Sequence, residues 1–123
     1  MPIGRFQGNL PERTFEFAVT ILDLVRQIPD GTVGWVVGKQ LARSGTSIGA
    51  NICEANHAFT DAEFAHRCSI ARKESSETDY WLRLCHRCDL LSAEQSVPAR
   101  QEAEELTKIL TTIVKKLQQD QPS

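Results

Sequence analysis

Two Glu-x-x-His motifs are the residues best spaced to hold a metal ion: Glu54–His57 and Glu63–His66. In di-iron carboxylate bundles this spacing presents both ligands on one helical face. Such a site needs further carboxylates from other helices, and the last helix offers only Lys115, Lys116 and Gln118 at that end. We therefore expect no metal and no cofactor, and we interpret the motifs as exposed polar residues around a loop.

Cys85 and Cys88 form a C-x-x-C pair, a spacing that redox enzymes and zinc sites use. A thioredoxin-like motif needs a strand-to-helix setting, which this sequence does not provide. A zinc site needs two more ligands, and Cys53 and Cys68 lie about two helical turns or more away. We interpret the cysteines as small residues that fill a core. A metal-dependent or redox enzyme is thus an unfavoured alternative.

The segment from Gln40 to Ala55 combines helical spacing with many small and polar residues. Gly45 and Gly49 each destabilise a helix by about 1 kcal/mol relative to alanine, so this helix needs a neighbour that approaches closely. Buried polar groups need hydrogen-bonding partners. If the chain turns back around Phe59, Arg43 lies level with Glu74 and one turn from Glu77.

The same register predicts that Asn51 lies near Arg67 and that Ser44 lies near Lys73. We interpret these residues as a structural polar seam that fixes register, and a binding or catalytic cluster is the alternative, because paired carboxylates can act as acid and base. The predicted seam contains Arg43, Ser47, Asn51, Glu54, Arg67, Lys73, Glu74 and Glu77.

Four helices are predicted to position these residues, at about 11–28, 32–57, 61–91 and 98–118. Pro11 and Pro98 suit a first helical turn, and Thr60-Asp61-Ala62-Glu63 has the pattern of a capping box. Residues 33–38 could also form a strand, but no partner strand is evident. Short connections make neighbours antiparallel, so we expect an all-α, up-down-up-down four-helix bundle in one domain over residues 1–123, with frayed termini.

Each predicted helix has an apolar or small inner face. In the first it holds Phe17, Ala18, Ile21, Leu22, Val25 and Ile28, and in the second Val37, Leu41, Ser44, Ile48, Ile52 and Ala55. In the third it holds Phe64, Cys68, Ala71, Ser75, Thr78, Leu82 and Cys85, and in the fourth Ala99, Ala103, Leu106, Leu110, Ile113 and Leu117.

The composition is that of a globular protein: 123 residues, 41% hydrophobic, with a net charge of −2. No apolar run reaches the ~20 residues of a membrane span, and the N-terminus lacks the apolar stretch of a signal peptide. We expect a cytoplasmic protein with reduced cysteines and no membrane partner.

A nucleic-acid partner is possible, although the net charge does not favour it. Candidate phosphate contacts on the third and fourth helices are Arg72, Arg83, Arg87, Lys108 and Lys115. Acidic residues are interleaved with them, and Trp35, Tyr80 and Trp81 are too scattered for a base-stacking platform. An RNA- or DNA-binding accessory protein is therefore the alternative function.

Apolar residues outside the predicted inner faces favour self-association, because a lone bundle would expose them. They are Val33, Trp35, Val36 and Trp81.

Two blocks carry a resemblance to a known family: Gln40–Ala55 and Phe64–Leu82, with Arg13-Thr14 and Phe17-Ala18 in support. They resemble the four-helix bundle proteins encoded in intervening sequences of large-subunit ribosomal RNA genes. The resemblance implies a small bacterial, cytosolic bundle that assembles into homopentameric rings and has no established enzyme activity. The resemblance implies no catalytic residues. The scaffold residues that it carries over are Arg43, Ser47, Asn51, Glu54, Lys73, Glu74, Glu77, Tyr80 and Trp81.

A relative of that family, the accessory factor of diversity-generating retroelements, associates with a reverse transcriptase and nucleic acid. Such relatives are strongly basic, whereas this chain has a net charge of −2. The leading expectation is therefore a non-enzymatic assembly module that forms a homo-oligomer, a pentamer by resemblance.

Overall fold

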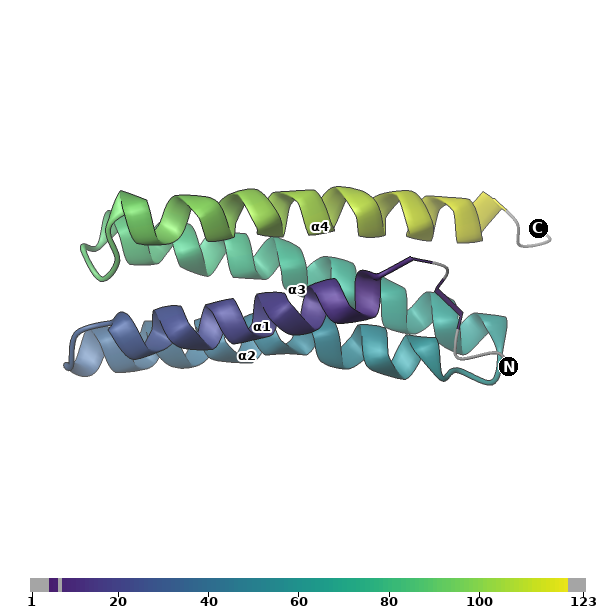
Figure 1. The fold of residues 1–123 in the computed structure, drawn as a ribbon, viewed down its shortest axis with the longest axis horizontal. Helices are drawn as coiled ribbons and strands as arrows, with labels where there is room; N and C mark the ends of the chain where they lie inside the picture. Colours follow the sequence, from purple (N-terminus) through teal and green to yellow (C-terminus); the bar gives the residue numbers. More distant parts are fainter. Residues whose placement is uncertain (1–4, 7, 120–123) are drawn as a thin grey trace.

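Four long helices make up the computed structural model, which describes residues 5, 6 and 8–119. They are α1 (Leu10–Gln27), α2 (Thr32–Asn56), α3 (Asp61–Arg87) and α4 (Ala93–Gln119). Consecutive helices run antiparallel and pack along their length, whereas α1 and α4 touch much less (Figure 1). The all-α up-down-up-down bundle predicted from the sequence is confirmed, and residues 33–38 are helical.

The predicted boundaries of α1 and α2 are correct to within one residue, but α3 ends earlier than predicted. It ends at Arg87 rather than Leu91, because the chain turns at Asp89, whose φ is 59°. A left-handed residue cannot continue a right-handed helix. The predicted cap at the other end of α3 is present, since the Glu63 N–H donates to the Thr60 hydroxyl at 3.1 Å.

The predicted start of α4 at Pro98 is wrong, because the helix begins at Ala93 and contains Pro98 in its interior. Ser92 and Gln95 cap it reciprocally. The Gln95 N–H donates to the Ser92 hydroxyl at 3.1 Å, and the Ser92 N–H donates to Gln95 Oε1 at 2.7 Å. The Ser-x-x-Gln pattern of a capping box is a sequence signal for this start, and Pro98 gives a competing signal six residues further on.

The predicted inner faces of α2 and α3 are buried in full, and that of α4 is buried from Ala99 to Leu110, with Ile113 and Leu117 partly buried. The prediction for α1 is wrong at Leu22, which is 40% exposed. The buried positions of α1 are Leu10, Thr14, Phe17, Ile21 and Leu24.

Gly45 and Gly49 of α2 face α1 rather than α3. A Cβ added to Gly45 would lie 2.6 Å from Ile21 Cγ2, and one added to Gly49 would lie 3.1 Å from the Thr14 carbonyl oxygen. The first distance is shorter than real Cβ contacts and the second is tighter than most of them, so the two glycines allow α1 to approach α2 closely. Helix α2 thus uses one side for close packing on α1 and another for polar contacts with α3.

Within the described residues, no helix is both long and apolar enough to cross a membrane. The predicted fraying at the C-terminus falls mostly on residues 120–123, which lie outside the described residues, while 118 and 119 are helical.

Candidate functional site

Arg43 is the centre of the polar contacts between α2 and α3. Its guanidinium donates to Glu74 at 3.2 Å and also pairs with Glu77. Glu77 accepts a further hydrogen bond from the Trp81 indole N–H at 2.8 Å. The predicted pairing of Arg43 with both carboxylates is confirmed, and it ties two turns of α3 to one residue of α2.

Asn51 forms a second polar contact, toward the other end of the two helices. Its side-chain oxygen accepts from Arg67 at 3.2 Å, and its amide donates to the Ser47 carbonyl at 2.9 Å and hydroxyl at 3.1 Å. Asn51 is only 8% exposed, so these bonds replace its contact with water. The predicted proximity of Asn51 and Arg67 is confirmed.

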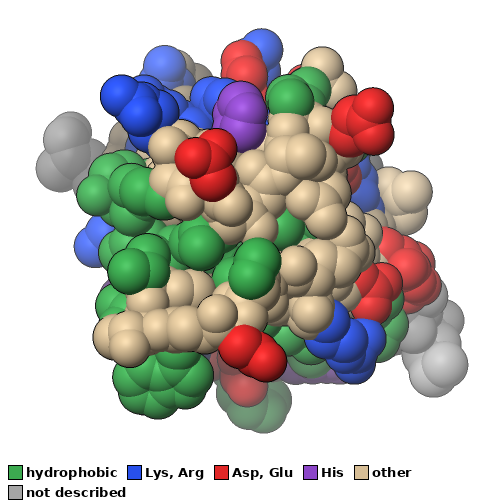
Figure 2. All heavy atoms as spheres, turned by 90° about the vertical axis from the view of Figure 1, so that its left-hand side faces the viewer, with side chains coloured by type: hydrophobic (Ala, Val, Ile, Leu, Met, Phe, Trp, Pro, Cys, Tyr) green, Lys and Arg blue, Asp and Glu red, His purple; other side chains and the backbone are tan. Residues whose placement is uncertain are grey.

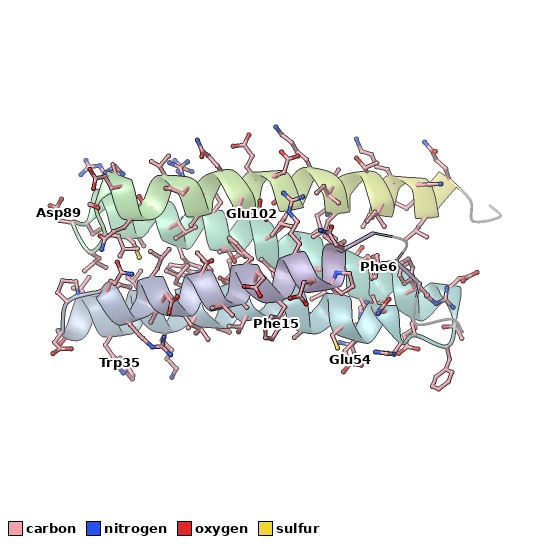
Figure 3. The ribbon with its side chains drawn as sticks, viewed as in Figure 1. Phe6, Phe15, Trp35, Glu54, Asp89 and Glu102 are labelled. Carbon is pink, nitrogen blue, oxygen red and sulfur yellow. The ribbon has the colours of Figure 1, made fainter. Side chains whose placement is uncertain are left out.

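Ser44 does not meet Lys73 as predicted. It accepts a hydrogen bond from Thr78 at 3.0 Å, and both hydroxyls are fully buried. Lys73 and Glu54 are exposed, and neither has an ion pair or side-chain hydrogen bond with a described residue. Figure 3 shows Glu54 pointing away from the bundle. Lys73 and Glu54 are therefore outside the observed polar seam, which consists of Arg43, Ser47, Asn51, Arg67, Glu74 and Glu77.

The observed polar seam has no unmet hydrogen-bonding capacity in its interior. Across the described residues, every buried side-chain nitrogen or oxygen has a hydrogen-bond partner. A catalytic or ligand-binding cluster usually holds polar groups that await a substrate. The geometry therefore suits a structural network.

Three polar contacts to α4 lie outside the predicted seam, because the register that the sequence predicts covers only α2 and α3. Arg13 of α1 donates to both oxygens of Glu102, at 2.7 and 2.8 Å. Arg100 donates to Asp79 of α3 at 3.0 Å, and the hydroxyls of Ser75 and Thr107 lie 2.7 Å apart. The hydrogen bonds that Arg13 donates to Glu102 raise the pKa of the Arg13 guanidinium above its ordinary value. For the two ion pairs, the sequence signal is opposite charges that lie at the same level on neighbouring antiparallel helices.

The two Glu-x-x-His motifs do not converge. Glu54, His57 and His66 are exposed, and Glu63 accepts from the Phe59 N–H at 3.3 Å as part of the α3 cap. No group of three His, Cys, Asp or Glu side chains in the described part of the chain is placed to share a metal ion.

The C-x-x-C pair is divided between core and surface. Cys85 is buried and Cys88 is exposed. Burial, with a smaller effect from Cys88, raises the pKa of the Cys85 thiol to about 11, and burial does the same for Cys68. Because the thiolate is the reactive form, Cys85 is a poor nucleophile near neutral pH, and the core-filling interpretation fits its position.

A family comparison matches most of this fold. A model described as 23S rRNA-intervening sequence protein matches residues 9–112. The chain belongs to this family. The match includes the observed polar seam, α1 to α3 and most of α4.

A solved structure is also similar to this member of the 23S rRNA-intervening sequence protein family. It is a protein of unknown function from the S23 ribosomal protein family of Bacteroides thetaiotaomicron, with 40% sequence identity and a TM-score of 0.80. The alignment covers 86% of this chain and 98% of that one. Among curated proteins, no relative matches.

Apolar side chains on the outside of α1 form what we call the outer stripe: Phe15, Val19 and Leu22, which are 60%, 41% and 40% exposed. On α2, Trp35 is 68% exposed and points away from the bundle (Figure 3). Val33 and Val36 are exposed, as predicted. Trp81 is not, because it packs against the core and bonds to Glu77.

The five predicted nucleic-acid contacts do not lie together in this family member. Arg83 and Arg87 line one hollow, Arg72 lines another, and Lys108 lies 3.5 Å from Glu104 of its own helix. Lys115 lies near the far end of α4, more than three turns beyond Arg100. A continuous track of these five residues is absent.

Proposed function

We propose that this protein is a non-enzymatic assembly module whose copies associate through the outer stripe into a closed ring, a pentamer. The observation that carries the proposal is the exposure of Phe15, Val19 and Leu22 on one face of α1. Positions i, i+4 and i+7 share a helical face, so the three side chains form one patch. Their burial against another copy would stabilise the assembly by removing apolar surface from water.

The small residues beside the outer stripe also support close contact. Gly45 and Gly49 allow α1 to pack close to α2. Two further small residues of α2 are Ala42, which is half-buried, and Ala50, which is exposed. An exposed apolar patch of this kind is typical of a protein–protein interaction site.

Ring closure has a geometric consequence. A ring with an odd number of copies has only cyclic symmetry, so each copy contributes two different surfaces. The outer stripe of one copy would then meet a second, different face of its neighbour. The pentamer itself is supported by the family resemblance stated above.

The burial and hydrogen bonding of the polar and thiol groups support the proposal that the protein is not an enzyme. The polar seam is satisfied internally, and two of the four thiols are buried with raised pKa values. The proposal includes a cytoplasmic location, where the four free cysteines would remain reduced.

The test is a light-scattering measurement of mass for the wild type and for a Phe15→Glu, Leu22→Glu variant. A buried charge at an interface is strongly unfavourable, so we expect the variant to be monomeric. The matched control is Thr20→Glu, which adds a charge to the exposed side of α1 nearest Glu16 and Pro98, away from the stripe. An oligomer that survives the double substitution, or one that Thr20→Glu also breaks, would contradict this interface.

A further inference from the structure

We propose that the corner where α3 turns into α4 binds a nucleotide, with its phosphates on arginines and its base on Tyr80. The hollow there has a volume of about 580 Å³. Its lining is mostly cationic or aromatic: Tyr80, Arg83, Leu84, His86, Arg87, Asp89 and Arg100. This site is separate from the outer stripe and does not depend on assembly.

The arginines are placed to share one anion. Arg83 and Arg87 are one turn apart on the same face of α3, both are exposed, and neither pairs with a described residue. Arg100 reaches the same hollow from α4 and is held by Asp79 at 3.0 Å. Guanidinium groups bind phosphate through paired, charge-assisted hydrogen bonds, so three of them around one hollow favour a phosphate-bearing ligand over a carboxylate.

The local charge is positive although the chain as a whole is negative. Three arginines line the hollow against Asp89 in the lining and Asp79 behind it. Figure 2 looks at this end of the bundle and shows Lys and Arg side chains gathered with a histidine along its upper, α4 side, while apolar side chains gather lower down. The short turn after Arg87 keeps the end of α3 next to the start of α4.

Tyr80 adds a flat surface for a base. It is 53% exposed, and its ring meets Trp81 edge-on with centroids 4.9 Å apart, which holds its orientation. Tyr80, Arg83 and Arg87 follow one another along one face of α3 over about 10 Å, a length that one nucleotide with several phosphates can span. Stacking on an aromatic ring accepts any base.

Calorimetry at low salt tests the site with adenosine triphosphate, inorganic triphosphate and adenosine. We expect adenosine triphosphate to bind at least about fivefold more tightly than triphosphate, because stacking adds to charge. Arg83→Gln with Arg87→Gln should weaken both anions by about tenfold or more. The matched control is Lys115→Gln with Lys116→Gln, which removes the same charge at the far end of α4 and should change affinity by less than about twofold.

Tyr80→Leu should abolish the preference for adenosine triphosphate and leave triphosphate binding unchanged. The proposal is overturned if the wild type binds none of the three probes at millimolar concentration. It is also overturned if both double variants weaken binding equally, or if Tyr80→Leu keeps the preference. Affinity that rises steadily with the length of a single-stranded oligonucleotide would instead indicate a nucleic-acid track, and would equally reject a discrete nucleotide site.

Discussion

Arg43 holds α2 and α3 in register through two carboxylates on successive turns of α3. Arg43→Met keeps the aliphatic packing but leaves Glu74, whose side chain is only 18% exposed, without a cation. We expect the free energy of unfolding to fall by about 1 kcal/mol, toward the upper end for partly exposed ion pairs. Urea unfolding at two salt concentrations measures this, and the loss should shrink at high salt.

The matched control is Arg26→Met, which breaks an exposed pair with Asp23 inside α1. Such i,i+3 pairs contribute only about 0.2–0.5 kcal/mol. Equal losses for the two variants would show that the seam contributes no more than an ordinary surface pair.

Gly45 lets α1 approach α2, and an added methyl group has no room. Its Cβ would lie 2.6 Å from Ile21 Cγ2. Although alanine favours a helix by about 1 kcal/mol, overpacking typically destabilises by about 1–3 kcal/mol. We expect Gly45→Ala to lower stability, as measured by thermal unfolding.

The double variant Gly45→Ala, Ile21→Ala separates the clash from other effects. Removing the Ile21 branches should make Gly45→Ala less harmful than it is alone, so the two changes should be non-additive. If the stability losses of the two single variants simply add, contact between the added methyl group and Ile21 is not the cause of the Gly45→Ala effect.

The buried thiols predict how stability responds to alkaline pH. Burial raises the folded-state pKa of Cys68 and Cys85 to about 11, above the ordinary thiol value of 9.0. Between these values the folded state keeps protons that the unfolded state releases, so stability should fall as pH rises from 9 to 11. A Cys68→Ala, Cys85→Ala variant should show a shallower fall in urea unfolding, whereas an identical slope would rule out the thiols as its cause.

Among the helices, α4 offers a test of whether Pro98 begins the helix or lies inside it. In the structure Ser92 and Gln95 cap the helix, and Pro98 lies inside it. Ser92→Ala should therefore destabilise the protein by about 1 kcal/mol. Pro98→Ala should stabilise it, because an interior proline removes a backbone hydrogen bond.

Thermal unfolding monitored by circular dichroism measures both changes. Ser76→Ala, an exposed site in the middle of α3, is the control and should be nearly neutral. If Pro98→Ala destabilises while Ser92→Ala does not, the helix begins at the proline after all.

The sequence was most informative where periodicity and local signals agreed. All seven predicted inner residues of α3 are buried, and the predicted contacts of Arg43 and Asn51 formed, because the α2–α3 turn sets their register. Ser44 met Thr78 instead of Lys73, since a buried hydroxyl is better matched by another hydroxyl than by a lysine that can reach water. Leu22 is exposed despite its apolar side chain, because apolar type alone does not say which of two neighbouring helix faces is covered.

The arginine hollow could not be predicted from the sequence either. Tyr80, Arg83 and Arg87 lie close together on α3, but Arg100 joins them only through the pairing of α3 with α4. That pairing follows from the true start of α4, which the conspicuous proline obscured. Predicting the arginine hollow would therefore require the register of α4 against α3.

The surface of the whole bundle differs in character from its interior. Among the described residues, every buried side-chain polar atom is hydrogen-bonded, whereas one long side carries the outer stripe and one end carries the arginine hollow. A bundle that served only as a stable monomer would not need exposed Phe15, Val19 and Leu22 on one face. The proposed assembly therefore requires another copy to cover that face.

The mass of the wild-type protein in solution tests this most directly. Sedimentation equilibrium or light scattering at tens of micromolar should give about 69 kDa, which is five times the chain mass of 13.8 kDa. A single species of 13.8 kDa at that concentration would contradict the proposed assembly.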